Sequence, residues 1–188
     1  HPMYRRQRQM CIRDRSNLIG KSVLDLGSGT GAAYEQLLNF ETTAIDPDIK
    51  MLELNAFDNK VLGSAENLPF EDNSFDNVFC SFVWRNVSNT NNAMNEVYRV
   101  LRPGGKFILL DMTRPKNSFL RMLHKIGTFK VLHLIGLITF NLKEYRFLYK
   151  SLDFYPQPEE HLNKDNFIDL KIERMGVFNF VYLAVFTK

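Results

Sequence analysis

The stretch VLDLGSGTGAAYEQL, residues 23–37, decides the fold. A hydrophobic run contains an acidic residue near its end, and glycines then occupy alternate positions at Gly27, Gly29 and Gly31. A helical pattern begins directly afterwards, so the stretch predicts a strand, a tight loop and a helix. The apolar positions that carry this prediction are Val23, Leu24 and Leu26 before the loop and Ala32, Ala33, Leu37 and Leu38 after it.

The glycines raise the question of what lies against the loop. Glycine permits a positive φ and the close approach of a ligand, and the N–H groups that open a helix point at that ligand. One alternative is a turn that needs glycine for its own geometry. The other is a nucleotide-type ligand, either a dinucleotide such as NAD or S-adenosylmethionine. Gly27, Gly29 and Ala32 also satisfy the dinucleotide pattern G-x-G-x-x-G/A, so the loop alone leaves both ligands open.

Length and composition favour one cytoplasmic domain. The chain has 188 residues, of which 45% are hydrophobic, enough for a single core. No apolar run approaches the roughly 20 residues of a membrane-spanning helix, and we expect no secretory signal. The two cysteines, Cys11 and Cys80, are too few and too far apart for a zinc site or a disulfide framework. We therefore expect no bound metal.

The net charge of +3 does not represent most of the chain, because the first residues account for it. Residues 1–15 carry five arginines and one aspartate without apolar periodicity, and we interpret them as a non-native or disordered leader. A basic nucleic-acid-binding arm is the competing interpretation, and we expect no nucleic-acid partner. The remaining charge is uneven: residues 16–100 carry a net −7, whereas residues 102–150 carry a net +8.

Strands and helices alternate after the leader. Such alternation implies an α/β fold with a doubly wound, mostly parallel sheet, helices on both faces, and ligands at the carboxyl ends of the strands. Residues 16–188 are therefore expected to form one domain. The expected strands cover residues 23–26, 42–45, 60–62, 75–83 and 106–112, and the expected helices about 32–38, 47–55 and 89–101.

The C-terminal part departs from this alternation. Residues 117 to about 151 lack strand alternation, and we expect them to form a helical lid inserted in the domain. Two β-rich runs close the chain as an antiparallel pair joined near Gly176, which completes a seven-stranded sheet. The lid helix would carry Phe119, Met122, Leu123 and Ile126 on one face and Arg121, His124 and Lys125 on the other.

Four ordered motifs resemble class I S-adenosylmethionine-dependent methyltransferases, which have a Rossmann-like fold. They are VLDLGSGTG (23–31), Asp46 after the second strand, GSAENLPFEDNSFDNVFCSF (63–82) and NEVYRVLRPGGKFILLD (95–111). Three segments are more narrowly similar to the ubiquinone/menaquinone biosynthesis C-methyltransferase family. They are RNV (85–87), EVYRVLRPGG (96–105) and EYRFLYKSLDFYPQPEE (144–160).

The resemblance implies S-adenosylmethionine as the cofactor. Asp25 would orient its ammonium end, and Asp46 can accept both ribose hydroxyls, although capping of the following helix is an alternative role. The family commonly holds the adenine amine with an acidic or amide residue where this chain has Ser64. The backbone of Ala65 and Glu66 is therefore the expected adenine contact. The residues assigned to the cofactor are Asp25, Gly27, Ser28, Gly29, Gly31, Asp46, Pro47, Ser64, Ala65, Glu66 and Ser81.

Catalysis is assigned by resemblance to Arg85 and Asn86. Methyl transfer needs a nucleophile held in line with an already activated methyl group, so positioning supplies most of the catalysis. The two side chains would stabilise a phenolate oxygen or hold a water that takes the ring proton. A structural ion pair is the alternative role of Arg85. Trp84 would either line the substrate pocket or pack in the core.

The predicted function is C-methylation of a ring in a lipid-soluble, prenylated quinol precursor. O- or N-methylation of another small molecule is the alternative enzymatic function, and an inactive cofactor-binding remnant is the non-enzymatic one. Because such a quinol lives in the bilayer, we expect peripheral contact with the inner face of a membrane through the basic segment 102–150. The alternative is that this segment only covers the substrate pocket. The oligomeric state is left open.

Overall fold

The structure is a computed structural model. The chain divides into two compact units. Of the described residues, the first unit comprises those within 18–110, 166–171 and 183–188, and the second those within 111–162 and 172–182. The predicted leader, residues 1–15, lies outside the described residues, and the single domain with a lid at about 117–151 stays a prediction. The structure describes residues 18–138, 146, 149–153, 155–162, 166–176 and 179–188.

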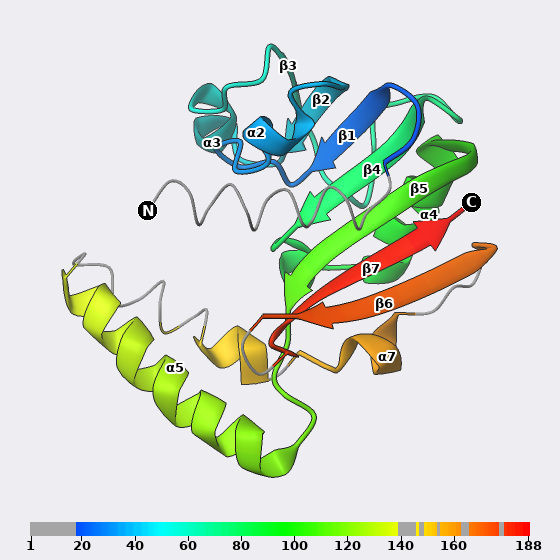
Figure 1. The fold of residues 1–188 in the computed structure, drawn as a ribbon. Coiled ribbons are helices and arrows are strands. Elements are labelled where there is room, and N and C mark those ends of the chain that lie inside the picture. The colour runs from blue at the N-terminus through cyan, green and yellow to red at the C-terminus, as the bar shows by residue number, and fades with distance from the viewer. Residues whose placement is uncertain (1–17, 139–145, 147–148, 154, 163–165, 177–178) are drawn as a thin grey trace. The chain divides into compact units, whose positions relative to one another are not determined.

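A seven-stranded sheet has the strand order β3-β2-β1-β4-β5-β7-β6 (Figure 1). β1 pairs in parallel with β2 and β4, β2 pairs in parallel with β3, and β4 with β5. The predicted doubly wound, mostly parallel sheet is confirmed. The strands are β1 Ser22–Leu26, β2 Glu41–Asp46, β3 Asn59–Leu62, β4 Phe75–Ser81, β5 Leu101–Met112, β6 Asp169–Met175 and β7 Val181–Thr187.

The two C-terminal strands form the predicted antiparallel pair. The amide of Thr113 donates to the carbonyl of Phe180 at 2.7 Å, and the amide of Gly104 donates to the carbonyl of Lys188 at 2.9 Å, so β7 runs against β5. β6, orange in Figure 1, lies beside β7 at the edge of the sheet and points in the opposite direction. Gly176 lies in the connection between them with a φ of 82°, a conformation that favours glycine.

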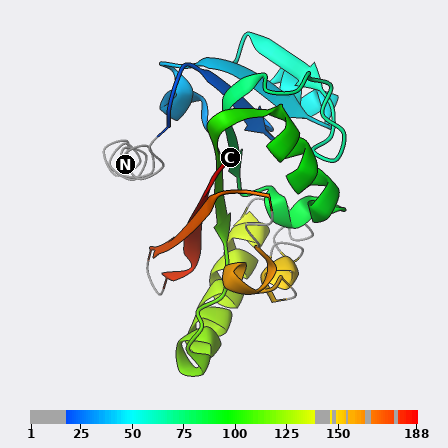
Figure 2. The ribbon, with the colours of Figure 1, turned by 90° about the vertical axis from the view of Figure 1, so that its right-hand side faces the viewer.

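Helices cover both faces of the sheet. α2 and α4 lie on opposite faces (Figures 1 and 2). Asn89 caps α4 by accepting the amide of Asn92 at 3.1 Å, and Asp48 caps α3 by accepting the amide of Lys50 at 2.9 Å. The helices are α2 Tyr34–Leu37, α3 Ile49–Glu53, the 3-10 helix η1 Trp84–Asn86, α4 Thr90–Val100, α5 Ser118–Ile138 and α7 Pro158–His161.

The central strands bury their side chains, as expected for a parallel sheet covered on both faces. Cys80, in β4, is buried. Trp84 is 1% exposed and contacts Phe107, with 5.3 Å between ring centroids, so the core-packing alternative holds for this residue. The other buried apolar residues of these strands include Val23, Leu24, Leu26, Ala44, Ile45, Val78, Phe79, Ile108 and Leu109.

Two predicted boundaries are wrong. The helix after the glycine loop covers only Tyr34–Leu37, and Leu38, expected to pack on the sheet, is exposed. The motif RPGG, expected to separate a helix from a strand, lies within β5. Its glycines already pair with the end of the chain, because Gly104 donates to the carbonyl of Lys188 and Gly105 accepts the amide of the same residue. Pairing with a distant strand therefore decides this boundary.

The first turns of helix α5 carry the apolar and the polar face that the sequence predicts. The apolar face is nevertheless the exposed one: Phe119 is 64% exposed, whereas His124 on the opposite face is 8% exposed. The predicted helix faces are thus present, with the polar face packed. In the part of the chain that the structure describes, no helix is long and apolar enough to cross a membrane.

Candidate functional site

The carboxyl ends of three parallel strands bring the predicted cofactor residues together. Leu26, the last residue of β1, pairs with Ile45 of β2 and with Cys80 of β4. The glycine loop follows β1, and Asp46 and Ser81 are the final residues of the two neighbouring strands. These three features therefore share one edge of the sheet, which is where doubly wound sheets bind ligands.

The glycine loop bends over the end of β2. The amides of Gly27 and Ser28 both donate to the carbonyl of Ile45, at 2.9 and 3.0 Å. Gly27, Gly29 and Gly31 have φ values of 68°, 51° and 84°, which favour glycine. A Cβ added at Gly29 would meet no protein atom within 4 Å, so the backbone there faces open space. A ligand can therefore approach this backbone closely.

Asn55, which was not among the predicted site residues, holds this loop from the end of α3. The side chain is buried and donates through Nδ2 to Oγ of Ser28 at 3.1 Å and to the carbonyl of Gly29 at 2.9 Å. A Cβ at Gly31 would approach Oδ1 of Asn55 to 2.9 Å, so glycine at this position makes room for the amide. Nothing in the sequence around Asn55 forms a motif, and only the fold reveals its contact.

Asp46 connects the loops that follow β1 and β2. Its Oδ2 accepts the amide of Gly29 at 2.9 Å, and its Oδ1 accepts the amide of Asp48 at 2.9 Å. A carboxylate has about four acceptor positions, so both oxygens keep a lone pair for ribose hydroxyls. The capping alternative holds only in part, because Asp48 itself is the N-cap of α3.

Asp25 is a buried carboxyl with an unsatisfied oxygen. Its side chain is 2% exposed, and Oδ2 has no hydrogen-bond partner among the described residues. Burial, followed by the negative charge of Asp46, raises the pKa of Asp25 to about 7. A cationic ligand group would satisfy this oxygen and favour the charged form of the carboxyl.

Two cavities, of about 470 Å³ and 260 Å³, flank the glycine loop. Volumes of this order suit a small-molecule ligand. Of the predicted cofactor residues, Gly31 alone lines neither cavity. The larger cavity is lined by Gly27, Gly29, Asp46, Pro47, Ser64, Ala65 and Glu66, and the smaller by Asp25, Gly27, Ser28, Gly29 and Ser81, among others.

The side chain of Glu66 fixes the predicted adenine segment. Its carboxylate accepts the hydroxyl of Ser64 and, through Oε1, the amides of Ser88 and Asn89 at 2.9 and 3.4 Å. These hydrogen bonds, that from Ser64 first, lower the pKa of Glu66 and keep it charged. The hydroxyl of Ser64 thus supports the loop, and the backbone of residues 65 and 66 remains the expected adenine contact.

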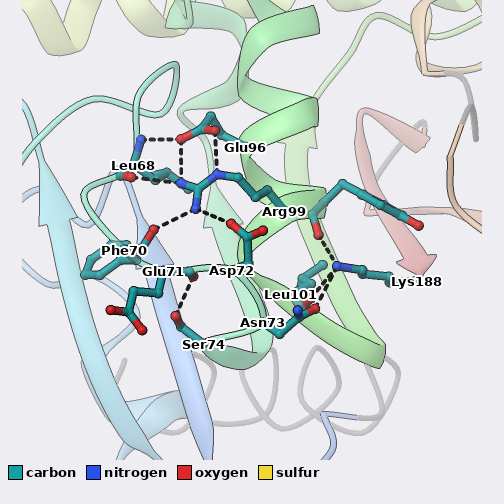
Figure 3. Close-up of polar contacts among 11 residues, drawn as sticks. Leu68, Phe70, Glu71, Asp72, Asn73, Ser74, Glu96, Arg99, Leu101 and Lys188 are labelled. Carbon is teal, nitrogen blue, oxygen red and sulfur yellow. Dashed lines mark hydrogen bonds and ion pairs between the residues drawn. The ribbon is translucent and has the colours of Figure 1, made fainter.

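Arg99 of α4 fixes residues 68–72, which follow the predicted adenine segment (Figure 3). It donates through Nη1 to the carbonyl of Phe70 at 2.7 Å and through Nη2 to the carbonyl of Leu68 at 2.9 Å. Glu96 accepts both Arg99 and the amide of Leu68, and the hydrogen bond from Arg99 is the main cause of its lowered pKa. Asp72 completes the network with an ion pair to Arg99 at 3.0 Å. The network holds the segment against α4.

The predicted catalytic pair lies in η1, which begins three residues after the last residue of β4. Asn86 is exposed and lines the larger cavity. Arg85 is half-buried and lines neither of the two cavities. Successive residues of a 3-10 helix point about 120° apart, so only one of the two can face the same cavity wall. The structure therefore brings Asn86 to the cofactor cavity, and the role of Arg85 stays a prediction.

The residues at this edge fit S-adenosylmethionine. Asp25 offers an open acceptor for an ammonium group, Gly29 offers an accessible backbone, and Asp46 retains acceptors for a ribose diol. The last two features also suit a dinucleotide. Geometry alone thus indicates a nucleotide-type ligand.

Comparison with known proteins decides between the two ligands. The sequence model that describes the ubiE/COQ5 methyltransferase family matches residues 1–168. This chain belongs to that family. The predicted methyltransferase with S-adenosylmethionine as its cofactor is confirmed, and the dinucleotide alternative is wrong.

Two relatives from Rickettsia illustrate the similarity. The chain is 37% identical over 177 residues to the ubiquinone/menaquinone biosynthesis C-methyltransferase UbiE of Rickettsia bellii (strain OSU 85-389), a match that covers 84% of this chain and 71% of that protein. UbiE of Rickettsia felis is 38% identical over 151 residues, which cover 79% of this chain and 56% of that protein. Both relatives have the same name.

Solved structures share the fold at lower identity. A methyltransferase from Thermotoga maritima has a TM-score of 0.66 at 19% identity, covering 99% of this chain and 96% of that one. Phosphoethanolamine N-methyltransferase 2 of Haemonchus contortus, solved with S-adenosyl-L-methionine, has a TM-score of 0.61 at 24% identity, covering 90% of this chain and 38% of that one. At these identities the likeness concerns the fold alone, and the predicted methyltransferase fold is confirmed.

Proposed function

We propose that this protein transfers a methyl group from S-adenosylmethionine to a ring carbon of a prenylated quinol precursor. The observation that carries the cofactor half is the unsatisfied carboxyl of Asp25 beside the open backbone of Gly29. The substrate class follows from the Rickettsia relatives, whose names specify C-methylation in ubiquinone/menaquinone biosynthesis.

The cofactor site is proposed to divide its work among three groups of residues. Asp25 binds the ammonium end, since its buried oxygen has no other partner among the described residues. Asp46 accepts the ribose hydroxyls with the lone pairs left over from its two backbone contacts. The backbone of Ala65 and Glu66 receives the adenine in the larger cavity, on a loop that the Glu66 carboxylate holds in place.

S-adenosylmethionine supplies a methyl group on a sulfonium, which needs no further activation. The ring carbon of the substrate would take that methyl as its bond to sulfur breaks, which leaves S-adenosylhomocysteine, and the ring would then lose its proton. An electron-rich ring, best as a phenolate, is therefore required. Asn86, at the wall of the larger cavity, is proposed to orient the quinol oxygen or a water that accepts the ring proton. Arg85 is proposed to stabilise the phenolate through its positive charge.

Methylation of a short-chain, water-soluble quinol tests the reaction. With methyl-labelled cofactor, we expect the label on a ring carbon, identified by mass spectrometry and by resistance of the product to ether cleavage. Arg85→Ala should lower the turnover at least about 10²-fold, the scale of losing one transition-state donor, with little change in cofactor affinity. A parallel loss of affinity and turnover would assign Arg85 to structure. A labelled ether or amine in place of a C-methyl product would contradict the proposed reaction.

The proposed substrate also suggests where the protein works. A prenylated quinol partitions into lipid, so we propose a cytoplasmic protein that acts at the inner face of a membrane. The basic segment 102–150, with its net charge of +8, supports this location. Basic side chains near an anionic leaflet contribute about 1 kcal/mol each.

A further inference from the structure

Helix α5 exposes apolar side chains along one side, where Lys130 is also exposed. Phe119, Ile126 and Leu134 are 64%, 50% and 59% exposed, and positions at intervals of three or four residues fill the same side of the helix. Most of a surface helix's large apolar side chains normally face a core. The exposed apolar residues of this helix, called the α5 stripe below, are Phe119, Met122, Leu123, Ile126, Phe129, Val131, Leu134, Leu137 and Ile138.

Arg114 anchors the opposite, polar side of α5. It is 3% exposed and donates through Nη1 to Oγ1 of Thr128 at 2.8 Å, and the same nitrogen lies 3.1 Å from Nδ1 of His124. Its Nε donates to Asp153 at 2.9 Å, and its guanidinium stacks 5.0 Å from the ring centre of Tyr149. A buried cation with these partners is costly to displace. The rotation of α5 about its axis is therefore fixed, with the stripe facing away from Arg114.

The charge of α5 has one sign. Ser118–Ile138 contains Arg121, Lys125 and Lys130 and no aspartate or glutamate. Lys130 is exposed, and Arg121 and Lys125 are half-buried beside the packed side. The helix thus combines exposed apolar side chains with positive charge, two features of helices that bind anionic membranes.

We infer that the α5 stripe is a docking surface for an anionic lipid bilayer. Its apolar side chains match the acyl region just below the headgroups, and its lysines and arginine match the negative surface. A second copy of this chain is a poorer occupant, because an isologous contact along α5 would bring like charges together. The inference rests on the proposed function only for its biological purpose, which is access to a lipid-soluble quinol.

Vesicle flotation with the full-length chain tests the inference. The five arginines of residues 1–15 are changed to glutamine in every sample, because that leader could bind anionic lipid by itself. Vesicles of phosphatidylcholine alone are compared with vesicles that also contain phosphatidylglycerol. We expect binding only to the anionic vesicles and weakening as salt is raised.

Two pairs of matched variants assign the binding to α5. Phe119→Gln with Ile126→Gln should weaken binding at least about tenfold, whereas Leu62→Gln with Ile168→Gln, at exposed apolar positions in the other unit, should leave it unchanged. Lys130→Glu should weaken binding, whereas Lys171→Glu, on β6, should not.

Three results would overturn the inference. They are unchanged vesicle binding after the two α5 substitutions, equal binding to neutral vesicles, and self-association that those substitutions abolish in the absence of lipid. Methylation of the water-soluble quinol without vesicles should be the same in the α5 variants and in the unchanged protein. Loss of that reaction in every sample, with vesicle binding intact, would refute the proposed reaction and leave the docking surface standing.

Discussion

The raised pKa of Asp25 makes the affinity for S-adenosylmethionine depend on pH. The pKa is about 7 in the ligand-free protein, so the carboxyl is about one-tenth ionised at pH 6 and about three-quarters ionised at pH 7.5. A cationic ligand group binds the ionised form. Affinity should therefore rise about eightfold between these two pH values, which is about 1.2 kcal/mol.

Titration calorimetry measures both the affinity and the proton that accounts for it. At pH 7, binding should release about half a proton, seen as a difference in heat between buffers of different ionisation enthalpy. Asp25→Asn keeps the shape of the side chain and removes its titration, so the variant should bind more weakly at pH 7.5 and show no pH dependence. S-adenosylhomocysteine keeps the ammonium but lacks the sulfonium charge, and it should show the same pH dependence as the cofactor.

The outcomes separate the possible partners of Asp25. A pH dependence that disappears with S-adenosylhomocysteine would assign the sulfonium as the partner. An affinity that is flat in the unchanged protein, or equally steep in Asp25→Asn, would refute the reasoning from burial. Stability gives an independent check. Since the pKa is 3.8 for an unperturbed aspartate and about 7 in the folded protein, the stabilisation is complete below about pH 4 and lost as the pH rises through 7. Asp25→Asn should therefore raise the melting temperature of the ligand-free protein at pH 8.

Three further substitutions test the support of the site. Asp46→Asn removes an acceptor shared by Gly29 and the ribose, and should weaken cofactor binding by about 1–3 kcal/mol in calorimetry; unchanged affinity in a folded protein would contradict the ribose assignment. Asn55→Ala frees the glycine loop from its hydrogen bonds to Ser28 and Gly29, and should raise the cofactor Kd about tenfold, the effect of about 1.4 kcal/mol. Arg99→Ala should lower the free energy of unfolding by about 2 kcal/mol, with a melting temperature lower by about 5 °C; an unchanged melting curve would mean that its hydrogen bonds are replaced by water.

The sequence predicts the sheet well because its signals are local. A buried parallel strand is a short apolar run bounded by loop residues, and that pattern places β1 and β2 within a residue or two of their observed bounds. The glycine loop and Asp46 are found for the same reason, since each directly follows its strand. Sites at the carboxyl ends of adjacent parallel strands need no long-range contact to be recognised.

The parts that sequence reasoning misses depend on long-range contacts. Asn55 supports the glycine loop from just beyond the end of α3, and Glu66 accepts amides of the turn before α4. The extension of β5 through RPGG depends on pairing with Lys188 at the end of the chain. The partners in each of these contacts are far apart in the sequence, so the periodicity and spacing of residues do not predict the contacts.

The orientation of α5 is the sharpest case, because hydrophobic periodicity identifies two faces without deciding which one packs. Sequence reasoning assigns the apolar face of a helix to the core. This assumes that no buried charged group elsewhere needs the polar face as its hydrogen-bond partner. Here Arg114, buried before the helix begins, makes its ion pair with Asp153 at 2.9 Å and still has N–H groups to satisfy. His124 and Thr128 lie one turn apart on α5 and meet that need.

Leaving such donors buried and unsatisfied costs about 1–3 kcal/mol for each group, more when the group is charged. Turning the apolar stripe inward would therefore give up this network. If the stripe faces a membrane, both requirements are met, because the bilayer buries the apolar side chains while Arg114 keeps its hydrogen-bond partners.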